Sequence, residues 1–202
     1  MARTPKVVED RREQIMDAAL RVFAKKGFAR ASNKDIAREA GITPGLIYHY
    51  FKSKYDLLRA VLEARSPLQL LESNAPQLRD LPPEAVLRAM SEQILMIADN
   101  ENFGQLMRVY LSELLHNPKV LPMGTSMIQK SVTIIETYLT EMMEQGELRR
   151  ADSGLVAHLL MGSIMDLVLR RQVLHDPVTL QYSHQQIVDS LVSTALQGLK
   201  PR

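Results

Sequence analysis

The chain has 202 residues and a formal net charge of +2, a length suited to one small domain joined to a medium-sized one. It contains no cysteine, which excludes a disulfide framework and a thiolate metal site and favours a reducing cytoplasm as its setting. Its polar, basic start is unlike a secretory signal. The longest uncharged run in the apolar C-terminal half, 153–165, falls short of the ~20 residues that a membrane span needs. We therefore expect a cytoplasmic protein without a membrane span.

The charge is unevenly distributed along the chain. Residues 1–65 hold 14 Lys or Arg and 8 Asp or Glu, a net charge of +6, whereas residues 66–202 hold 11 and 15, a net charge of −4. Concentrated positive charge is what attraction to a phosphate backbone requires. The N-terminal part is therefore a candidate nucleic-acid-binding domain.

The first predicted helix runs from about Val8 to Lys26, and Gly27 ends it. Apolar residues at helical spacing give it one buried stripe, made of Ile15, Ala19, Val22 and Phe23. Arg3 and Lys6 precede it, either as a basic arm for a minor groove or as a disordered extension.

A short second helix is predicted to begin near Asn33. Ser32 followed by Asp35 has the spacing of a capping box, in which each side chain bonds the other residue's amide. Gly41 supplies the left-handed backbone that often ends a helix. Thr43 can then cap a third helix, with Pro44 in its first turn. The turn between the two helices is about three residues long, as in a helix-turn-helix motif.

The third helix can be divided into two faces by placing its residues ~100° apart. Ile47, Tyr50 and Phe51 fall on the side that must meet the core. Gly45 and His49 point away from it. Three residues flank this outer face, namely Leu46, Tyr48 and Lys52. The outer face is therefore the candidate surface for reading DNA.

A further helix is predicted from Ser53, which with Asp56 repeats the capping pattern, to about Leu71. Its first turn carries Lys54, so that amides, helix dipole and a lysine offer a site for a phosphate.

From Arg12 to about Val61 the sequence resembles the DNA-binding domain of the TetR family of transcriptional regulators, through AKKGF and SNKDIAREAGITPGLIYHYFKSKYDLL. The resemblance implies a helix-turn-helix that contacts double-stranded DNA at a palindromic operator. The DNA contacts it implies are Ser32, Asn33, Lys34, Thr43, Pro44, Gly45, Leu46, Tyr48, His49 and, on phosphate, Lys54. Leu46 replaces a small or hydroxyl residue usual in the family, so only an apolar contact is expected there.

The rest of the chain is also predicted to be helical. Helices are expected over about 83–98, 103–116, 122–145, 152–174 and 184–199, and no strand-like alternation persists anywhere. The fold class is therefore all-α: an N-terminal three-helix helix-turn-helix domain plus a larger helical ligand-binding and dimerisation domain. We place the first domain at residues 1–52, with a linking helix over about 53–71, and the second at residues 53–202.

The last two predicted helices carry wider apolar surfaces than a monomer needs. In the TetR family the equivalent helices pair with those of a second copy, and a two-fold homodimer suits a palindromic operator. The alternative is a purely intramolecular core. The expected interface residues are Leu155, Leu159, Gly162, Ser163, Asp166, Val188, Leu191, Val192 and Ala195.

The middle helices are rich in methionine, which adapts to varied apolar ligands but is also common in ordinary cores. Candidate residues for an effector cavity are Met90, Ile94, Phe103, Met107, Tyr110, Ile134, Ile135, Tyr138, Met142 and Met165. Few charged residues lie on these faces, which favours an apolar or aromatic small molecule over an anionic one.

The sequence thus predicts a ligand-responsive, dimeric transcriptional regulator, most often a repressor in this family, that an apolar molecule releases from DNA. A rival hypothesis is a DNA-binding protein whose larger domain docks a protein partner. An enzyme is not expected, because the histidines and serines form no recognisable catalytic arrangement. His116, His158 and Asp166 are the nearest to one, should they meet across helices. Neither a metal nor a cofactor is expected.

Overall fold

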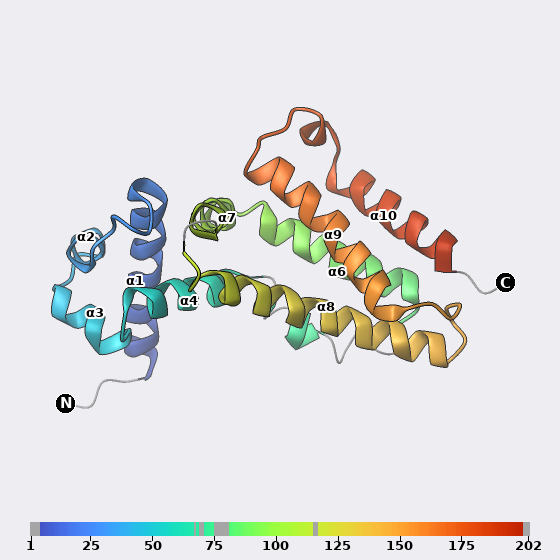
Figure 1. Ribbon diagram of the computed structural model, residues 1–202, viewed down its shortest axis with the longest axis horizontal. Helices are drawn as coiled ribbons and strands as arrows, with labels where there is room; N and C mark the ends of the chain where they lie inside the picture. The colour runs from blue at the N-terminus through green and yellow to red at the C-terminus, as the bar shows by residue number, and fades with distance from the viewer. Residues whose placement is uncertain (1–4, 67, 69–70, 75–80, 115–116, 200–202) are drawn as a thin grey trace. The chain divides into compact units, whose positions relative to one another are not determined.

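The computed structural model describes residues 5–66, 68, 71–74, 81–114 and 117–199. These residues form an all-helical fold, with no β-strand among them (Figure 1). In chain order the elements are α1 (Pro5–Lys26), α2 (Asn33–Glu39), α3 (Pro44–Tyr50), α4 (Lys54–Arg65), α6 (Pro83–Ala98), α7 (Glu101–Leu114), α8 (Leu121–Glu144), α9 (Ser153–Gln172), the 3₁₀ turn η1 (Thr179–Gln181) and α10 (His184–Leu199). The all-α fold class predicted from the sequence is confirmed.

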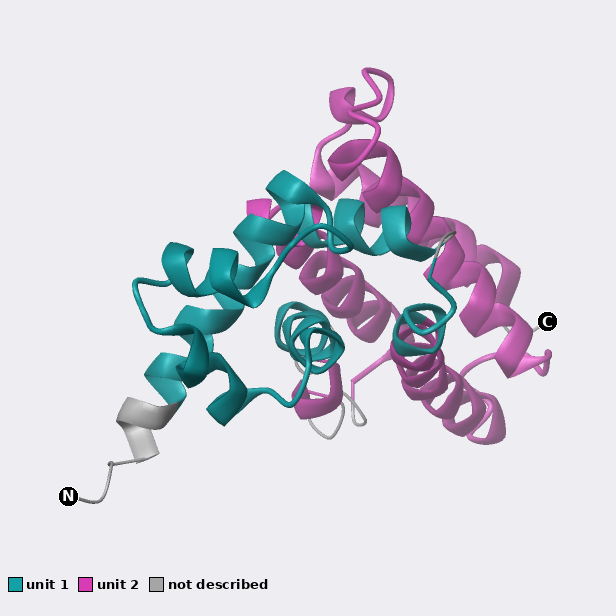
Figure 2. Cartoon of the chain, turned by 60° about the vertical axis from the view of Figure 1, so that its left-hand side comes forward, with its two compact units in different colours: residues 1–66, 105–124 teal, residues 67–104, 125–202 magenta. Residues whose placement is uncertain are grey.

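The chain forms two compact units, each discontinuous in sequence (Figure 2). Unit 1 comprises Met1–Ser66 and Gln105–Gly124, and unit 2 comprises Pro67–Gly104 and Thr125–Arg202. Helices α1 to α4 belong to unit 1. The functional boundary that we place after residue 52 stays a prediction.

Unit 1 is built around α1, which packs against α2 and α4. The predicted stripe of α1 is buried, and α4 buries Leu57, Leu58, Val61 and Leu62. Full burial of such a side chain stabilises a fold by about 1.5–3 kcal/mol, so the packing of α4 against α1 stabilises unit 1. At the end of α4, Arg65 donates to Glu13 and Asp17 of α1, each at 2.7 Å.

The segment after α7 also belongs to unit 1. Asn117 donates a hydrogen bond to the hydroxyl of Tyr55 in α4, at 2.8 Å. The ammonium of Lys119 lies 5.5 Å from the centre of the Tyr55 ring. Residues 62 positions apart in the sequence thus hold the start of α4 from the side.

The helix that begins at Lys54 is interrupted earlier than predicted. α4 ends at Arg65, and Ser66 has extended φ and ψ angles of −81° and 147°. Ser66 precedes a proline, whose ring disfavours helical angles in the residue before it. Helical residues reappear at Leu68 and over 71–74. The prediction of one unbroken helix over 53–71 overlooked this proline.

The remaining helices begin and end within a few residues of their predicted limits. α1 begins earlier than expected, at Pro5, so Lys6 belongs to a helix rather than to an arm. Arg3 lies outside the described residues.

Unit 2 is built around α6, which packs against both α10 and α9. Its core side chains come from all three helices and include Val86, Leu87, Met90, Ile94, Leu95, Ala157, Leu160, Met161, Ile164, Val168, Ile187, Val188 and Val192. The assignment of Val188 and Val192 to a dimer interface is therefore wrong. Both side chains are at most 1% exposed within one chain, because α10 turns this stripe inward.

By length and composition, α9 is the one helix among the described residues that could cross a membrane. Charged residues interrupt its apolar stretch, so the uncharged run 153–165 is shorter than the helix. α9 carries Asp166 and Arg170, paired at 2.9 Å, and buries Leu160, Ile164 and Val168. It is therefore a core helix of unit 2.

Candidate nucleic-acid interface

The capping box predicted at the start of α2 is confirmed. The Ser32 hydroxyl accepts a hydrogen bond from the Asp35 amide at 3.2 Å, and the Ser32 amide donates to Asp35 Oδ2 at 3.2 Å. The hydroxyl also donates its proton to Asp35 Oδ2, at 2.7 Å. The Ser32 side chain is thus used for holding the helix end.

Asp35 also ties α2 to α1. Its Oδ1 accepts a hydrogen bond from Lys26 Nζ at 2.6 Å and one from Arg38 Nη2 at 2.8 Å. The Lys26 ammonium and the two donors of Ser32 hold the pKa of Asp35 well below its usual range. The carboxylate therefore stays ionised and anchors the start of α2 to the last residue of α1.

The turn between α2 and α3 is fixed by Gly41, whose φ angle is +64°. The Gly41 amide donates to the Arg38 carbonyl at 3.2 Å, and the Ile42 amide donates to the Ala37 carbonyl at 2.9 Å. This pair of bonds is a Schellman motif, which satisfies the last carbonyls of a helix through a left-handed residue. The predicted helix end at Gly41 is confirmed.

Thr43 occupies the N-cap position of α3, but its side chain makes no capping hydrogen bond. The expectation that its hydroxyl caps α3 is therefore wrong. Pro44 follows as the first helical residue and fixes φ in advance, so the helix starts without that cap. The Thr43 side chain is exposed.

α3 has the two faces that the sequence predicts. Ile47 and Phe51 are buried and Tyr50 is half-buried, whereas Gly45, Tyr48 and His49 are exposed. The Tyr48 side chain is 62% exposed. A Cβ atom added to Gly45 would meet nothing within 4 Å, so packing within the chain does not require glycine there. The outer face of α3 thus carries a phenol and an imidazole, and at Gly45 its backbone is exposed.

All ten predicted DNA contacts lie in unit 1. Seven are exposed, namely Ser32, Lys34, Thr43, Pro44, Gly45, Tyr48 and His49, and three are half-buried, namely Asn33, Leu46 and Lys54. Their roles on DNA stay predictions.

Two lysines near α3 keep exposed ammonium groups that pair with no other group in the described part of the chain. They are Lys34, which the sequence selected, and Lys52, which it named only as a flanking residue. Lys52 lies two residues beyond the end of α3, after the extended residue Phe51. A lysine directly behind the outer face of α3 was the available signal for a second phosphate contact.

Lys54 lies differently from what a phosphate contact suggests. Its Nζ donates to the carbonyl oxygens of Phe28, Ala29 and Ala31, at 2.7, 3.1 and 2.8 Å. A lysine ammonium has three N–H donors. All three therefore have partners inside unit 1.

The residues weighed for catalysis are used separately. His158 Nδ1 lies 2.9 Å from the Gly154 carbonyl of its own helix, and Asp166 pairs with Arg170. His116 lies outside the described residues. No group of three or more His, Asp or Glu side chains is placed to hold a metal ion in the part of the chain that the structure describes.

The ten candidate effector residues are divided between the two units. Met107 and Tyr110 belong to unit 1, and the other eight belong to unit 2, namely Met90, Ile94, Phe103, Ile134, Ile135, Tyr138, Met142 and Met165. Seven of the ten are buried and three, Met107, Ile134 and Met165, are half-buried. Their joint role as a cavity lining stays a prediction.

Two of these candidates have structural duties of their own. Tyr138 donates a hydrogen bond to the Leu81 carbonyl at 3.1 Å, and burial raises its pKa to about 12. Tyr110 lies so close to Gly124 that a Cβ atom there would be 1.9 Å from its hydroxyl oxygen. The lack of a side chain at Gly124 therefore makes room for the Tyr110 ring.

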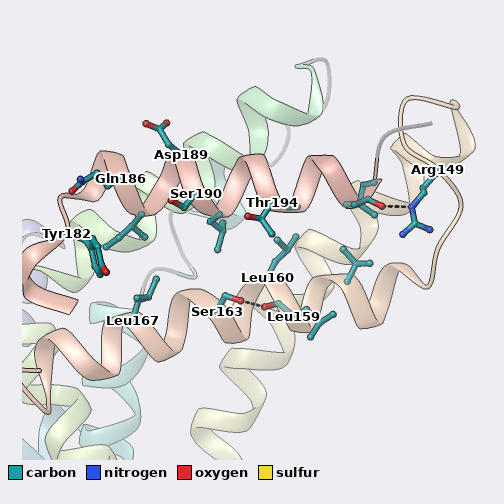
Figure 3. Close-up of a pocket in the computed structure, with 16 residues that line it drawn as sticks. Arg149, Leu159, Leu160, Ser163, Leu167, Tyr182, Gln186, Asp189, Ser190 and Thr194 are labelled. Atoms are coloured by element: carbon teal, nitrogen blue, oxygen red, sulfur yellow. Dashed lines mark hydrogen bonds between the residues drawn. The ribbon is translucent and has the colours of Figure 1, made fainter. Parts of the chain in front are cut away.

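An open groove of about 860 Å³ runs between α9 and α10 (Figure 3). Leu159, Ser163 and Leu167 line it from α9, and Leu191 and Ala195 line it from α10. Further along the predicted interface of α9, Leu155, Gly162 and Asp166 are exposed. The groove includes none of the ten effector candidates.

Comparison with protein families assigns both parts of the chain. Residues 15–61 match the model of bacterial regulatory proteins of the tetR family. Residues 85–198, more than half of the chain, match the C-terminal domain of AefR-like transcriptional repressors. The chain belongs to the TetR family of transcriptional regulators. Members of this family are DNA-binding regulators and not enzymes.

Individual relatives agree with this assignment. UidR of Escherichia coli strain K12 is 33% identical over 141 residues, which cover 68% of each chain. The fold is similar to that of FadR from Bacillus subtilis in complex with stearoyl-CoA, with a TM-score of 0.76, 23% identity and coverage of 92% and 98%. It is also similar to SmeT in complex with triclosan, with a TM-score of 0.79, 22% identity and coverage of 95% and 92%. At these identities the two structures establish likeness of fold.

Asp35 should make the stability of unit 1 depend on pH. Because its folded pKa is lowered, it contributes stability that is complete above the ordinary aspartate pKa of about 3.9 and is lost as the pH falls toward the folded pKa. Asp35→Asn removes the charge, so its thermal midpoint should be lower than that of the wild type at pH 7. The difference should shrink as the pH falls from 4 to 2, measured by circular dichroism.

Glu39→Gln is the matched control, because it removes another α2 carboxylate whose pair with Arg21 is exposed. Exposed pairs contribute ~0–1 kcal/mol, so its midpoint should hardly move. Equal midpoints for wild type and Asp35→Asn at pH 7 would contradict the anchoring role.

Proposed function

We propose that this TetR-family regulator is a repressor that binds a palindromic operator as a homodimer and leaves it when an apolar small molecule binds. The observation that carries the proposal is the outer face of α3, where Gly45, Tyr48 and His49 are exposed while Ile47 and Phe51 hold the other side in the core. A phenol and an imidazole on such a helix suit phosphates and base edges.

Charge supports the same reading. The first 65 residues carry a net charge of +6, and Lys34 and Lys52 present exposed ammonium groups beside the reading helix. In a dimer these groups are duplicated, and a two-fold axis places two reading helices about 34–36 Å apart, in successive major grooves. The cytoplasm is the compartment that such a task requires.

Exposed apolar residues on α9 support the homodimer. Leu155 and Leu159 are 60% and 63% exposed, one helical turn apart, and Gly162 and Ser163 continue the same face with small side chains. The small residues allow the α9 helices of two protomers to approach closely, and the interface would then bury two leucines from each.

An apolar effector is supported by the known ligands of structural relatives. FadR of Bacillus subtilis binds stearoyl-CoA and SmeT binds triclosan, and both share this fold. The candidate lining residues of the present chain are apolar or aromatic throughout. We therefore assign it an effector with a large apolar part.

A second candidate function is docking of a protein partner by the larger domain. Four large apolar side chains are exposed between α9 and α10, namely Leu174, Val178, Leu180 and Tyr182. Exposed apolar side chains of this size suit a protein contact. They make partner docking the alternative to a small effector.

Gly45→Ala should separate DNA binding from folding. The new methyl group meets nothing inside the chain, and alanine favours helix, so the thermal midpoint should not fall. On DNA the same methyl group should clash where the backbone approaches, and operator affinity should fall by about 1–3 kcal/mol. The operator is first selected from a random pool, and affinity is then measured by fluorescence anisotropy.

The same anisotropy measurement, repeated at several salt concentrations, tests the proposed DNA binding itself. Wild-type affinity should weaken steeply, with a slope of about −0.9 per phosphate neutralised. A flat response would exclude DNA binding through phosphates, whereas unchanged affinity of Gly45→Ala would exclude only the close approach at that residue.

Leu159→Glu should separate the dimer. The side chain is exposed in one chain, so a charge costs little there, but an interface would have to bury it unpaired. Analytical ultracentrifugation should show monomer, and operator affinity should collapse with α3 unchanged. Met96→Glu is the control, because Met96 is equally exposed, at 67%, on α6 of the same unit. A dimer of normal affinity in Leu159→Glu would exclude the α9 interface.

An apolar effector should weaken operator binding, and the operator should weaken effector binding by the same factor, because the coupling is reciprocal. Coupling of 1–3 kcal/mol corresponds to about 5–150-fold. A panel that includes stearoyl-CoA and triclosan is first screened for thermal stabilisation, and each binder is then titrated with and without operator. Should no compound stabilise the protein or change its operator affinity, the partner-docking alternative would replace the effector.

A further inference from the structure

Lys54 is the first residue of α4, a position where a positive charge is electrostatically unfavourable. The N-terminus of a helix carries partial positive charge, which stabilises anions and repels cations. The neighbouring cap is made by Ser53, which accepts a hydrogen bond from the Asp56 amide at 3.0 Å, so Lys54 does not serve the helix end. Its ammonium must gain its stabilisation elsewhere.

That stabilisation comes from the connection between α1 and α2. Nζ is bonded to the carbonyl oxygens of Phe28, Ala29 and Ala31, at 2.7, 3.1 and 2.8 Å. None of these carbonyls accepts a backbone hydrogen bond from any of the described residues. Three carbonyl dipoles that point at one place repel one another unless a donor or cation lies between them. The ammonium group supplies both the charge and the three donors.

Aromatic rings complete the surroundings of this charge. Nζ lies 4.6 Å from the centre of the Phe28 ring, within the range of a cation–π contact. Phe28 in turn packs edge-on against Phe23 and Tyr55, with ring centres 5.1 and 5.0 Å apart. Two consecutive residues of α4, Lys54 and Tyr55, therefore hold the same connecting segment by charge and by ring contact.

The segment that Lys54 holds determines where α2 begins. Ala31 directly precedes Ser32, the N-cap residue of α2. On the other side, Lys26 of α1 holds Asp35, the partner of that cap. The start of α2 is thus fixed by two lysines, one from α1 and one from α4. Because α2 packs against α3, this anchoring also sets the direction of the reading helix.

We propose that Lys54 is a positioning residue for DNA binding in this chain, which holds the α1–α2 connection and so orients α2 and α3, instead of contacting a phosphate. The proposal rests on the proposed operator binding. A phosphate contact would require the ammonium to leave three carbonyl oxygens. The exposed lysines Lys34 and Lys52 are free of that cost and take the phosphate contacts.

The test compares Lys54→Met and Lys54→Arg with the controls Lys34→Met and Lys52→Met. Methionine keeps the aliphatic stem over Phe28 and removes the charge. Arginine keeps the charge and binds phosphate well, but no single nitrogen of its planar guanidinium can donate to all three carbonyl oxygens. Thermal midpoints are measured first, and anisotropy with operator and random DNA then follows at several salt concentrations, at a temperature where every variant is folded.

For Lys54→Arg we expect a lower thermal midpoint, at least tenfold weaker operator binding, a smaller ratio of operator to random affinity, and the salt slope of the wild type. Lys54→Met should share these results. Each control should keep the wild-type midpoint and flatten the slope, by about 0.9 for each phosphate that the variant no longer neutralises.

Three results would overturn the proposal. A flatter salt slope in Lys54→Met would identify a phosphate contact. Full operator affinity in Lys54→Arg would show that charge alone is needed. A lower midpoint with unchanged affinity and specificity in folded Lys54→Arg would leave the residue a purely structural role.

Hydrogen exchange keeps the test decisive if Lys54→Met does not fold or if no operator is found. In free Lys54→Arg, the amides of residues 28–35 should exchange faster than in the wild type, while those of α10 should not change. Unchanged exchange over 28–35 would overturn the proposal that Lys54 holds the α1–α2 connection. Absence of operator binding by the wild type would overturn the proposed function. The exchange result would then decide whether Lys54 holds the α1–α2 connection.

Discussion

The helix-turn-helix depends on one constraint: α2 and α3 have seven residues each and are too short to be stable alone. Isolated helices shorter than ~12–15 residues are marginal in water, because nucleation costs more than so few hydrogen bonds return. Their shape and direction must therefore come from their surroundings. Burial of Ile36, Ile47 and Phe51 holds α2 and α3 against the core of unit 1. The contacts of Lys26 and Lys54 at the start of α2 orient this helix. The outer face of α3 is thus positioned by contacts on the inner faces of α2 and α3 and at the start of α2.

Much of this head could be predicted because its signals are local. Ser32 and Asp35 lie three residues apart and form the expected cap, and Gly41 adopts the left-handed angle that its place after the helix demands. The inner and outer faces of α3 also follow from spacing alone. The proline after Ser66 is an equally local signal, and it explains why α4 ends at Arg65 instead of continuing to Leu71 as predicted.

What could not be predicted depends on partners distant in sequence. The carbonyl groups that hold Lys54 lie 23 to 26 positions earlier in the chain, and nothing in the sequence around Lys54 indicates them. Periodicity revealed a broad apolar surface on α10 but not which part meets the same chain. Val188 and Val192 are buried within one chain, while Leu191 and Ala195 line the groove, although all four lie on the same few turns.

Unit 1 is discontinuous, and this has a consequence for how the protein is made. Its first 66 residues are completed by Gln105–Gly124, with Asn117 bonded to Tyr55. During synthesis the ribosome must therefore release all of α6 and α7 before the DNA-reading head can gain its last supporting contacts. A fragment ending at residue 66 would lack the contacts that Asn117 and Lys119 make with Tyr55. Newly made chains consequently acquire a fully supported unit 1 only after α6 and α7 have emerged.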